Sequence, residues 1–348
     1  MDKDFLIIGA GVVGLGCAVA LLEHGARVTV MDRGLCGGES SWAGGGILSP
    51  LCPWDYPREV NRLATRGAEL FPAWAGALRE LTGIDPEYVK CGMRILPPFN
   101  RQAALRWAES NKLLVEEDGG ALILPSVAQV RNPRLIQALR RRVEMLGGRI
   151  VERCAVRKIA AENGCVKRVQ SDCGDFEADE FIVAAGAWSA LILGEHALHL
   201  DIRPVRGQML LFKIDRPPIH QIFLQHDLYL IPRADGHLLV GSTLEEVGFD
   251  KSVTLAARED LIRRAVSVLP QLSKAPLVRH WAGLRPASPH NIPVIGRHPY
   301  LNNLYINSGH FRYGVTMAPA SVEILINDLK GSQQELDVSP YRAGWGGQ

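Results

Sequence analysis

The hydrophobic pattern of the first 32 residues predicts a strand, a helix and a second strand in close succession. Residues 5–8 are a short apolar run, which is typical of a strand buried on both faces. A helical pattern follows over residues 14–24, and Gly25 ends it as glycine commonly ends helices. A second apolar run, residues 27–31, finishes at Asp32. This order of elements favours an α/β fold.

Helical and strand patterns continue to alternate up to about residue 200. Apolar residues recur at helical spacing over residues 63–81, with Pro72 inside the pattern, and again over residues 132–146. The Asn163-Gly164 pair predicts a hairpin turn. Three segments have the pattern of strands, residues 149–152, 156–159 and 180–185.

From residue 201 the pattern changes to the alternation of antiparallel strands. Strands are predicted at residues 203–214, 228–232 and 238–242, with an Asp-Gly hairpin turn at 235–236, a helix at 255–269, a last strand at 304–307 and a helix after Gly314. Segments of α/β character therefore bracket a mostly β segment, and a second insert is expected near residues 85–125. The predicted division is a first domain of residues 1–84, 126–200 and 280–348 and a second of residues 85–125 and 201–279.

Composition excludes several classes of protein. The 348 residues carry a net charge of +2 and 47% hydrophobic residues, which is ordinary for a globular enzyme. The absence of a basic tail or like-charge block disfavours a nucleic-acid partner. We find no apolar run of 18 residues, so no transmembrane segment is predicted.

The cysteines favour a reducing, cytoplasmic location. There are seven of them, an odd number, and no pair has Cys-x-x-Cys spacing, so neither a disulfide framework nor a structural zinc site is predicted. The N-terminus is too acidic, and too soon broken by glycine, for a signal peptide. His196 and His199 have the spacing of helical metal ligands but lack a third ligand, and we predict no metal site.

The sequence GAGVVG between the first strand and helix predicts a dinucleotide-binding turn. Gly9 permits the tight turn, Gly11 lets the backbone approach a pyrophosphate, and Gly14 lets the helix pack closely on the strand. The helix N-terminus offers amides and a dipole to the phosphates. Asp32, 23 residues after Gly9, is placed to accept a hydrogen bond from a ribose hydroxyl.

Five further motifs, together with this turn, resemble the glycine oxidase and D-amino-acid oxidase family of flavoenzymes. They are SSWAGGGIL, AAGAWS, YLIP, GLRP and GHFRYG, in that order along the chain. The resemblance covers about residues 4–330 and is nearest to the glycine oxidases of thiamine biosynthesis. It implies a Rossmann-type FAD-binding domain interleaved with an antiparallel-sheet substrate domain, which makes the protein α+β overall. It also implies non-covalent FAD, since no cysteine follows Cys173.

The resemblance implies which residues bind FAD. The glycine turn and the acid hold the pyrophosphate and ribose, the small-residue loops line the flavin, and the start of the last helix directs its positive end at the flavin. The residues expected to bind the cofactor are Gly9, Gly11, Val12, Val13, Gly14, Asp32, Arg33, Ser40, Ser41, Gly45, Gly46, Ile47, Val156, Ala185, Gly186, Trp188, His310, Phe311, Arg312, Tyr313, Gly314, Val315 and Thr316.

The resemblance also implies a substrate site for a small amino acid. Arg285 and Arg312 match the family's substrate arginines, and a guanidinium offers two parallel donors to a carboxylate. Tyr229 stands where the family has a tyrosine beside that carboxylate. Ile47 and Leu244 stand where glycine oxidases commonly have methionine, so a small apolar pocket is expected.

The reaction implied is hydride transfer from the substrate Cα to the flavin, giving a 2-oxo acid, ammonia and, with dioxygen as acceptor, hydrogen peroxide. No catalytic side-chain base is expected. Two alternatives remain open at this stage: a dehydrogenase of D-amino acids or proline that passes electrons to a quinone or partner protein, and a non-catalytic FAD-binding subunit. The second is disfavoured because Arg285, Arg312 and Tyr229 occur together. The family's habit of assembly implies a homo-oligomer.

Overall fold

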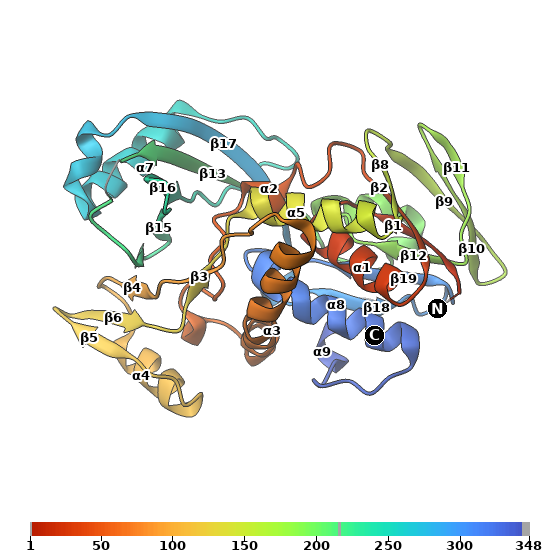
Figure 1. Ribbon diagram of the computed structural model, residues 1–348, viewed down its shortest axis with the longest axis horizontal. Helices are drawn as coiled ribbons and strands as arrows, with labels where there is room; N and C mark the ends of the chain where they lie inside the picture. Colours follow the sequence, from red (N-terminus) through yellow and green to blue (C-terminus); the bar gives the residue numbers. More distant parts are fainter. Residues whose placement is uncertain (1, 215–216, 343–348) are drawn as a thin grey trace.

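A computed structural model describes residues 2–214 and 217–342, which form two large sheets and the helices that cover them (Figure 1). Met1 and residues 215–216 and 343–348, which fall within the predicted domain ranges, lie outside the described residues. The first sheet has the order β18-β19-β12-β1-β2-β8, parallel except for β18. Its strands are β1 Asp4–Ile8, β2 Arg27–Met31, β8 Arg149–Val151, β12 Glu180–Val183, β18 Val294–Arg297 and β19 Leu304–Ser308.

β1 lies at the centre of this sheet and is buried on both faces, as its sequence predicts. Phe5 and Ile7 belong to the hydrophobic core under the helices, whereas Leu6 and Ile8 pack into a second core on the opposite face. The second core is closed by a three-stranded antiparallel sheet, β9 Val156–Glu162, β10 Cys165–Ser171 and β11 Gly174–Phe176. The short helices α6 Ser189–Leu193 and α9 Ser339–Arg342 lie at the periphery.

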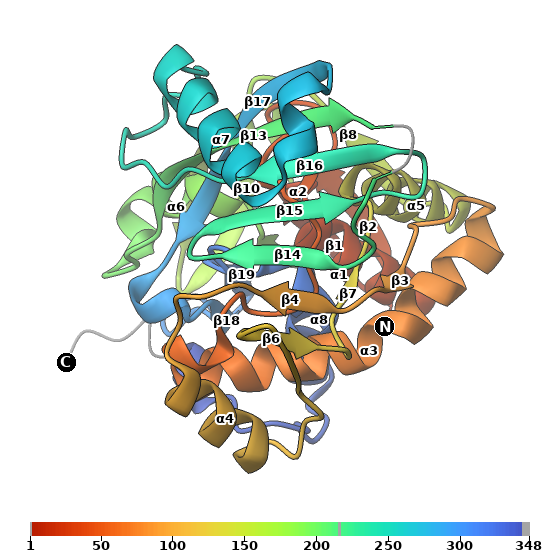
Figure 2. The same ribbon diagram turned by 90° about the vertical axis from the view of Figure 1, so that its left-hand side faces the viewer.

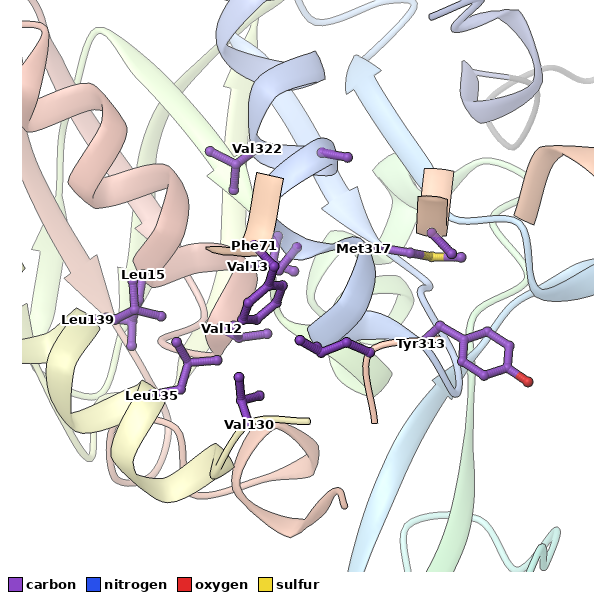
Figure 3. Packing of buried hydrophobic residues seen from close by; sticks show 14 of the residues in the cluster. Val12, Val13, Leu15, Phe71, Val130, Leu135, Leu139, Tyr313, Met317 and Val322 are labelled. Atoms are coloured by element: carbon purple, nitrogen blue, oxygen red, sulfur yellow. The ribbon is translucent and has the colours of Figure 1, made fainter. Parts of the chain in front are cut away.

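Four helices cover the other face of the sheet: α1 Val12–Glu23, α3 Arg58–Thr82, α5 Asn132–Met145 and α8 Gly314–Lys330. Figure 3 shows Leu15, Leu135 and Leu139 from α1 and α5 facing one another, with Met317 and Val322 of α8 nearby. α3 and α8 approach so closely at Gly67 that a Cβ there would lie 2.0 Å from the Thr316 carbonyl oxygen. The start of α8 is therefore fixed against α3, next to the sheet edge where β19 ends.

The second sheet has eight strands in the order β17-β13-β16-β15-β14-β4-β6-β5 (Figure 2). The helix α7 Leu255–Val268 packs on one face through Leu261 and Ala265, which contact Leu210, Leu230 and Val240 of the sheet. The strands are β4 Met93–Ile95, β5 Glu116–Asp118, β6 Ala121–Leu124, β13 Arg203–Lys213, β14 Ile222–Gln225, β15 Leu228–Pro232, β16 His237–Gly241 and β17 Leu277–Ala287.

The two chain segments predicted to form a second domain thus share one sheet. Strands β4, β5 and β6 join it where β4 pairs in parallel with β14, and α4 Arg101–Ser110 lies beside them. The short strands β3 Val89–Lys90 and β7 Ala128–Gln129 pair with each other where the chain passes between the two sheets. β17 continues to Ala287, past the predicted boundary at residue 280.

Most predicted elements are confirmed, including the helix that contains Pro72 and the hairpin at Asn163-Gly164. Several elements were not predicted, among them a short helix and a long strand. The glycine-rich loop begins with a short helix, α2 Ser40–Ala43, which is too short to show a periodic pattern. β17 was not predicted as a strand because Gly283 and Pro286 interrupt its apolar pattern. Within residues 2–214 and 217–342, none of the helices combines the length and apolar character required to cross a bilayer.

Candidate functional site

The glycine turn between β1 and α1 is as close-packed as its sequence predicts. Gly9 has φ +113°, and a Cβ at this residue would lie 2.4 Å from the Ala184 carbonyl oxygen of β12's C-terminal end. A Cβ at Gly14 would lie 1.9 Å from the Gly9 carbonyl oxygen. The two glycines therefore let the turn and the first turn of α1 fit against the sheet.

The N-terminus of α1 is capped from another segment. Gly11, the N-cap residue of α1, has no side chain that could accept a hydrogen bond. The Val12 amide donates instead to Ser41 Oγ of α2 at 3.0 Å. The other first-turn amides of a helix have no intrahelical partners and can bind an anion. α1 and α2 together therefore present a hydroxyl and several amides at one place, as a pyrophosphate requires.

Asp32 lies at the C-terminal end of β2, beside the glycine turn. Its Oδ2 accepts from the Ala10 amide and its Oδ1 from the Gly34 amide, both at 2.8 Å. Burial raises the pKa of Asp32, and the two amide hydrogen bonds oppose that rise. Each carboxylate oxygen keeps a further lone pair, so the group can still accept from a ribose hydroxyl.

A single long cavity extends from this turn to the second sheet. Its empty volume, counted together with the space open to solvent at its mouth, is about 1470 Å³. All the residues predicted to bind the cofactor line it except Gly14, which lies beneath the turn. Among those predicted to bind the substrate, Arg285, Arg312, Tyr229 and Ile47 line it.

The position of the Leu244 side chain differs from the prediction. Leu244 does not line the cavity, and its side chain belongs to the exposed apolar residues, with 54% of its surface accessible. The neighbouring residues explain this position. Thr243 and Glu245 are held against β13 by backbone and side-chain hydrogen bonds, including Gln208 N to Thr243 Oγ1 at 2.9 Å, so Leu244 projects away from that strand.

Three side-chain atoms on the cavity wall are buried and without a hydrogen-bond partner in the described structure: Asn132 Oδ1, Asn307 Oδ1 and His310 Nε2. Buried polar atoms in native proteins are normally satisfied. Burial lowers the pKa of His310 to about 3, so its ring is neutral at neutral pH. These three atoms fit a cavity whose natural occupant is polar, and a dinucleotide meets that requirement.

Asn132 and Asn307 were missed at the sequence level as cavity residues. Asn132 stands at the start of a predicted helix, where asparagine is common for local reasons. In the structure it is 1% exposed and its Nδ2 donates to the Ser41 carbonyl at 2.9 Å. Asn307 lies at the end of β19, and its Nδ2 donates to the Ser321 carbonyl at 3.0 Å. Only the fold places both beside the cavity.

The segment before α8 brings its backbone to the cavity in a constrained conformation. Phe311 has φ +45°, and its amide donates to the Pro286 carbonyl at 2.9 Å. Thr316 Oγ1 donates to the Ile47 carbonyl at 2.9 Å, which joins the first turn of α8 to the glycine-rich loop. Strained backbone of this kind collects at ligand sites, where the surrounding fold holds it.

Arg285 and Arg312 reach the same end of the cavity from β17 and from the turn before α8. Arg285 Nη1 donates to the Thr243 carbonyl at 3.1 Å and Nη2 to Ser242 Oγ at 2.6 Å. Burial lowers the pKa of Arg285, and the charge of Arg312 acts in the same direction. Among the described residues, neither arginine forms an ion pair with a carboxylate.

Tyr229 of β15 completes this end of the cavity. Its hydroxyl is directed to Met209 Sδ at 3.1 Å, a weak contact that leaves it available to a better acceptor. Two guanidinium groups and a phenol without carboxylate partners favour an anionic ligand, because an unpaired buried charge is costly. The cavity therefore extends from the glycine turn to an anion-binding end.

Arg33 and Trp188, both predicted to contact the cofactor, contact each other. The Arg33 guanidinium lies 3.8 Å from the centre of a Trp188 ring and also pairs with Glu39 at 3.3 Å. On the second domain's side, Phe249 lies against Trp188 with ring centres 5.4 Å apart, and Lys251 pairs with Glu39 at 2.8 Å. The loop after β16 thus closes over one side of the cavity.

Gly207 of β13 provides the space that Arg285 occupies, a role that the sequence does not reveal. It pairs with Gly283 across the strands, and a Cβ at residue 207 would lie 2.1 Å from Arg285 Nη1. The atoms that would be displaced are the end of a flexible side chain, so the fold can adjust while the guanidinium moves.

We therefore expect Gly207→Ala to weaken substrate binding with little change in stability. The KM for the substrate should rise about tenfold, the loss of one charged hydrogen bond, while the melting temperature stays within a few degrees. Steady-state kinetics and thermal unfolding measure the two effects. Gly76→Ala is the matched control, because a Cβ there meets nothing within 4 Å. A normal KM in Gly207→Ala would contradict the assigned position of Arg285.

Asp32→Asn tests the ribose end of the cavity. Asparagine replaces one acceptor oxygen by an NH₂ group that faces a backbone amide, so both a charge and an acceptor are lost. We expect the dissociation constant of FAD to rise about tenfold or more, measured by titrating the apoprotein and following flavin fluorescence. Asp2→Asn, at a side chain 93% exposed, should bind FAD normally. Equal affinity in both variants would exclude a ribose contact at Asp32.

Comparisons with known proteins agree with this geometry. The sequence profile of the FAD dependent oxidoreductase family (DAO) matches residues 4–327. A glycine oxidase of Pseudomonas putida is 40% identical over 358 aligned positions, which cover 98% of each chain. A bifunctional ThiO/ThiG protein of Trichormus variabilis is 30% identical, and the match covers 93% of this chain and 52% of that longer protein.

The fold is also that of a solved structure. The crystal structure of glycine oxidase from Geobacillus kaustophilus superimposes with a TM-score of 0.91 over 98% of both chains, at 25% identity. The similarity therefore extends over both sheets.

Proposed function

The chain belongs to the family of FAD-dependent oxidoreductases and is an enzyme of FAD-dependent amino-acid oxidation, and we propose that its substrate is glycine or another small amino acid or amine, such as sarcosine or a small D-amino acid. The observation that carries this proposal is the position of Arg285 and Arg312 at one end of the cavity, with no carboxylate of the described chain between them. An α-amino acid brings the missing carboxylate.

The chain's own residues have two tasks in this proposal. The α1 N-terminus with Ser41, and Asp32, hold the pyrophosphate and ribose of FAD, while Gly45, Gly46 and the first turn of α8 hold its ring. At the other end Arg285 and Arg312, with Tyr229, bind the substrate carboxylate and so orient the Cα. FAD, when bound, supplies the hydride acceptor.

The size of the substrate follows from the apolar contacts at this end. Ile47 lines the cavity, and Gly45 leaves no space beside it, since a Cβ there would lie 2.6 Å from Ile231 Cδ1. We propose that this closely packed apolar wall favours a substrate with a small side chain. Leu244 is not part of the wall, so the apolar contact predicted at that position is not used in the proposal.

We propose dioxygen as the electron acceptor: a primary amino acid, dioxygen and water give a 2-oxo acid, hydrogen peroxide and ammonia, and sarcosine releases methylamine in place of ammonia. The glycine oxidases among the relatives support this choice. We also propose that the enzyme works in the cytoplasm as a homo-oligomer and serves thiamine biosynthesis. Seven free cysteines support a reducing location, and the likeness to the ThiO/ThiG protein supports the pathway.

The test is anaerobic reduction of the purified holoenzyme, followed by readmission of air. Glycine, sarcosine, D-alanine, D-proline and L-proline are added in turn, and loss of the oxidised flavin absorbance is recorded. Reduction by glycine or sarcosine, with peroxide formed on reoxidation, is the expected result. Reduction without reoxidation by air would replace dioxygen with another acceptor. No reduction by any of the five would overturn the proposal.

A further inference from the structure

Ser242 is a buried hydroxyl at the anion-binding end of the cavity. It follows β16 directly, is 2% exposed and lines the cavity together with Arg285 and Tyr229. Gly241 pairs with Tyr229 in the sheet, and a Cβ there would lie 2.8 Å from the Tyr229 ring. Ser242 is therefore fixed between the two residues expected to meet the substrate carboxylate.

The Ser242 hydroxyl accepts a hydrogen bond but does not donate one within the described structure. Its Oγ accepts from Arg285 Nη2 at 2.6 Å. A serine hydroxyl also has one proton to donate, and within residues 2–214 and 217–342 no acceptor takes it. The Ser242 hydroxyl therefore lies beside the Arg285 guanidinium in the cavity wall, and its proton has no acceptor among the described residues.

The frame around Ser242 is rigid. Thr243, the next residue, accepts from Arg285 through its carbonyl at 3.1 Å, and its hydroxyl is bonded to Glu245. Glu245 in turn accepts two hydrogen bonds from Arg206, which is 4% exposed on β13. Two hydrogen bonds to this frame, to the Thr243 carbonyl and to Ser242 Oγ, therefore hold the Arg285 guanidinium beside the Ser242 hydroxyl.

We propose that Ser242 is a substrate-binding residue whose hydroxyl donates to the carboxylate bound by Arg285. The inference rests on the proposed function, because it assumes a carboxylate at this end of the cavity. Ser242 then has two contacts in one place: it fixes the guanidinium by accepting from it, and it adds a neutral donor to the carboxylate. This additional donor favours substrates with a carboxylate over amines that lack one.

The experiment uses the holoenzyme and acetate, which has the carboxylate but nothing to oxidise. Acetate binding is followed by the change in flavin absorbance. Ser242→Ala should weaken it about tenfold, the effect of removing a hydrogen bond to a charged group. Ser273→Ala, which removes an exposed hydroxyl bonded only to the Pro270 carbonyl, is the matched control and should bind acetate normally. Flavin content and melting temperature report folding, and Ser242→Cys, with a weaker donor of similar size, should lie between serine and alanine.

Making Ser242→Ala in the Arg285→Lys variant distinguishes a direct contact between Ser242 and the ligand from an effect that acts through Arg285. If Ser242 donates to the ligand, adding Ser242→Ala should weaken acetate binding at least a further threefold. No further loss in the double variant, or normal binding in Ser242→Ala alone, would overturn the inference while leaving the proposed function intact. Failure of the wild-type protein to bind acetate would instead overturn the carboxylate site itself.

Discussion

Arg285→Lys is expected to raise the KM for the amino-acid substrate about 100-fold, the loss of two charge-assisted hydrogen bonds at roughly 1.5 kcal/mol each. The guanidinium donates to the Thr243 carbonyl and to Ser242 Oγ from its two terminal nitrogens, and each of these nitrogens has a second N–H to donate. A lysine ammonium is a single point on a flexible chain and cannot meet these partners and both carboxylate oxygens together.

FAD binding should be unaffected in this variant, because the pyrophosphate and ribose contacts lie at the other end of the cavity. The ratio of flavin absorbance to protein absorbance measures this directly. Arg263→Lys, on the exposed side of α7 with a side chain 74% accessible, is the matched control and should keep a normal KM. Unchanged saturation in Arg285→Lys would show that the substrate carboxylate binds elsewhere.

The cofactor half of the site could be predicted from the sequence because its parts are local. The strand, the glycine turn, the helix and Asp32 lie within 32 residues, and each has a pattern set by one element. The structure confirms the strand, the turn and the helix, with Gly9 against Ala184 and the Ala10 amide on Asp32, and the contacts of these residues with FAD stay a prediction. Arg285 and Arg312 were identified by resemblance, and their position in one cavity agrees with that reading.

The residues that the sequence did not reveal depend on pairing between distant strands. Gly207 matters because β13 pairs with β17, which brings it beneath Arg285, 78 positions further along the chain (285 − 207). Ser242 matters because β16 ends beside β15 and Arg285. A glycine or serine in a strand has no local pattern that marks such a role. Leu244 shows the converse: its match to the family motif did not determine the direction of its side chain.

Arg233→Met is expected to destabilise the folded protein by about 3 kcal/mol, a large share of the ~5–15 kcal/mol typical of a domain. Arg233 is 6% exposed and donates to Gln129 Oε1 at 2.6 Å, to the Gly45 carbonyl at 2.8 Å and to the Val130 carbonyl at 2.9 Å. Burial lowers its pKa to about 10, so it is still charged at neutral pH.

Methionine leaves three buried acceptors without donors, at about 1–3 kcal/mol each. The cost of burying the guanidinium charge disappears at the same time, and the net loss is therefore smaller than the sum of the three. Urea unfolding of the apoprotein measures it. Arg101→Met, an exposed arginine on α4 paired with Glu117, should cost under ~1 kcal/mol. Similar losses in both variants would show that the buried contacts are not what makes Arg233 important.

The same variant connects stability with cofactor binding. Arg233 directly follows β15 of the second sheet, yet it donates to Gly45 in the loop predicted to lie against the flavin ring. Since this hydrogen bond joins the second sheet to the cofactor loop, its loss should also raise the dissociation constant of FAD, by about tenfold for one charged hydrogen bond. If Arg233→Met were less stable but bound FAD as tightly as the wild type, the loop would be held in place by its other hydrogen bonds, such as those from Thr316 Oγ1 to the Ile47 carbonyl and from the Val130 amide to the Gly46 carbonyl.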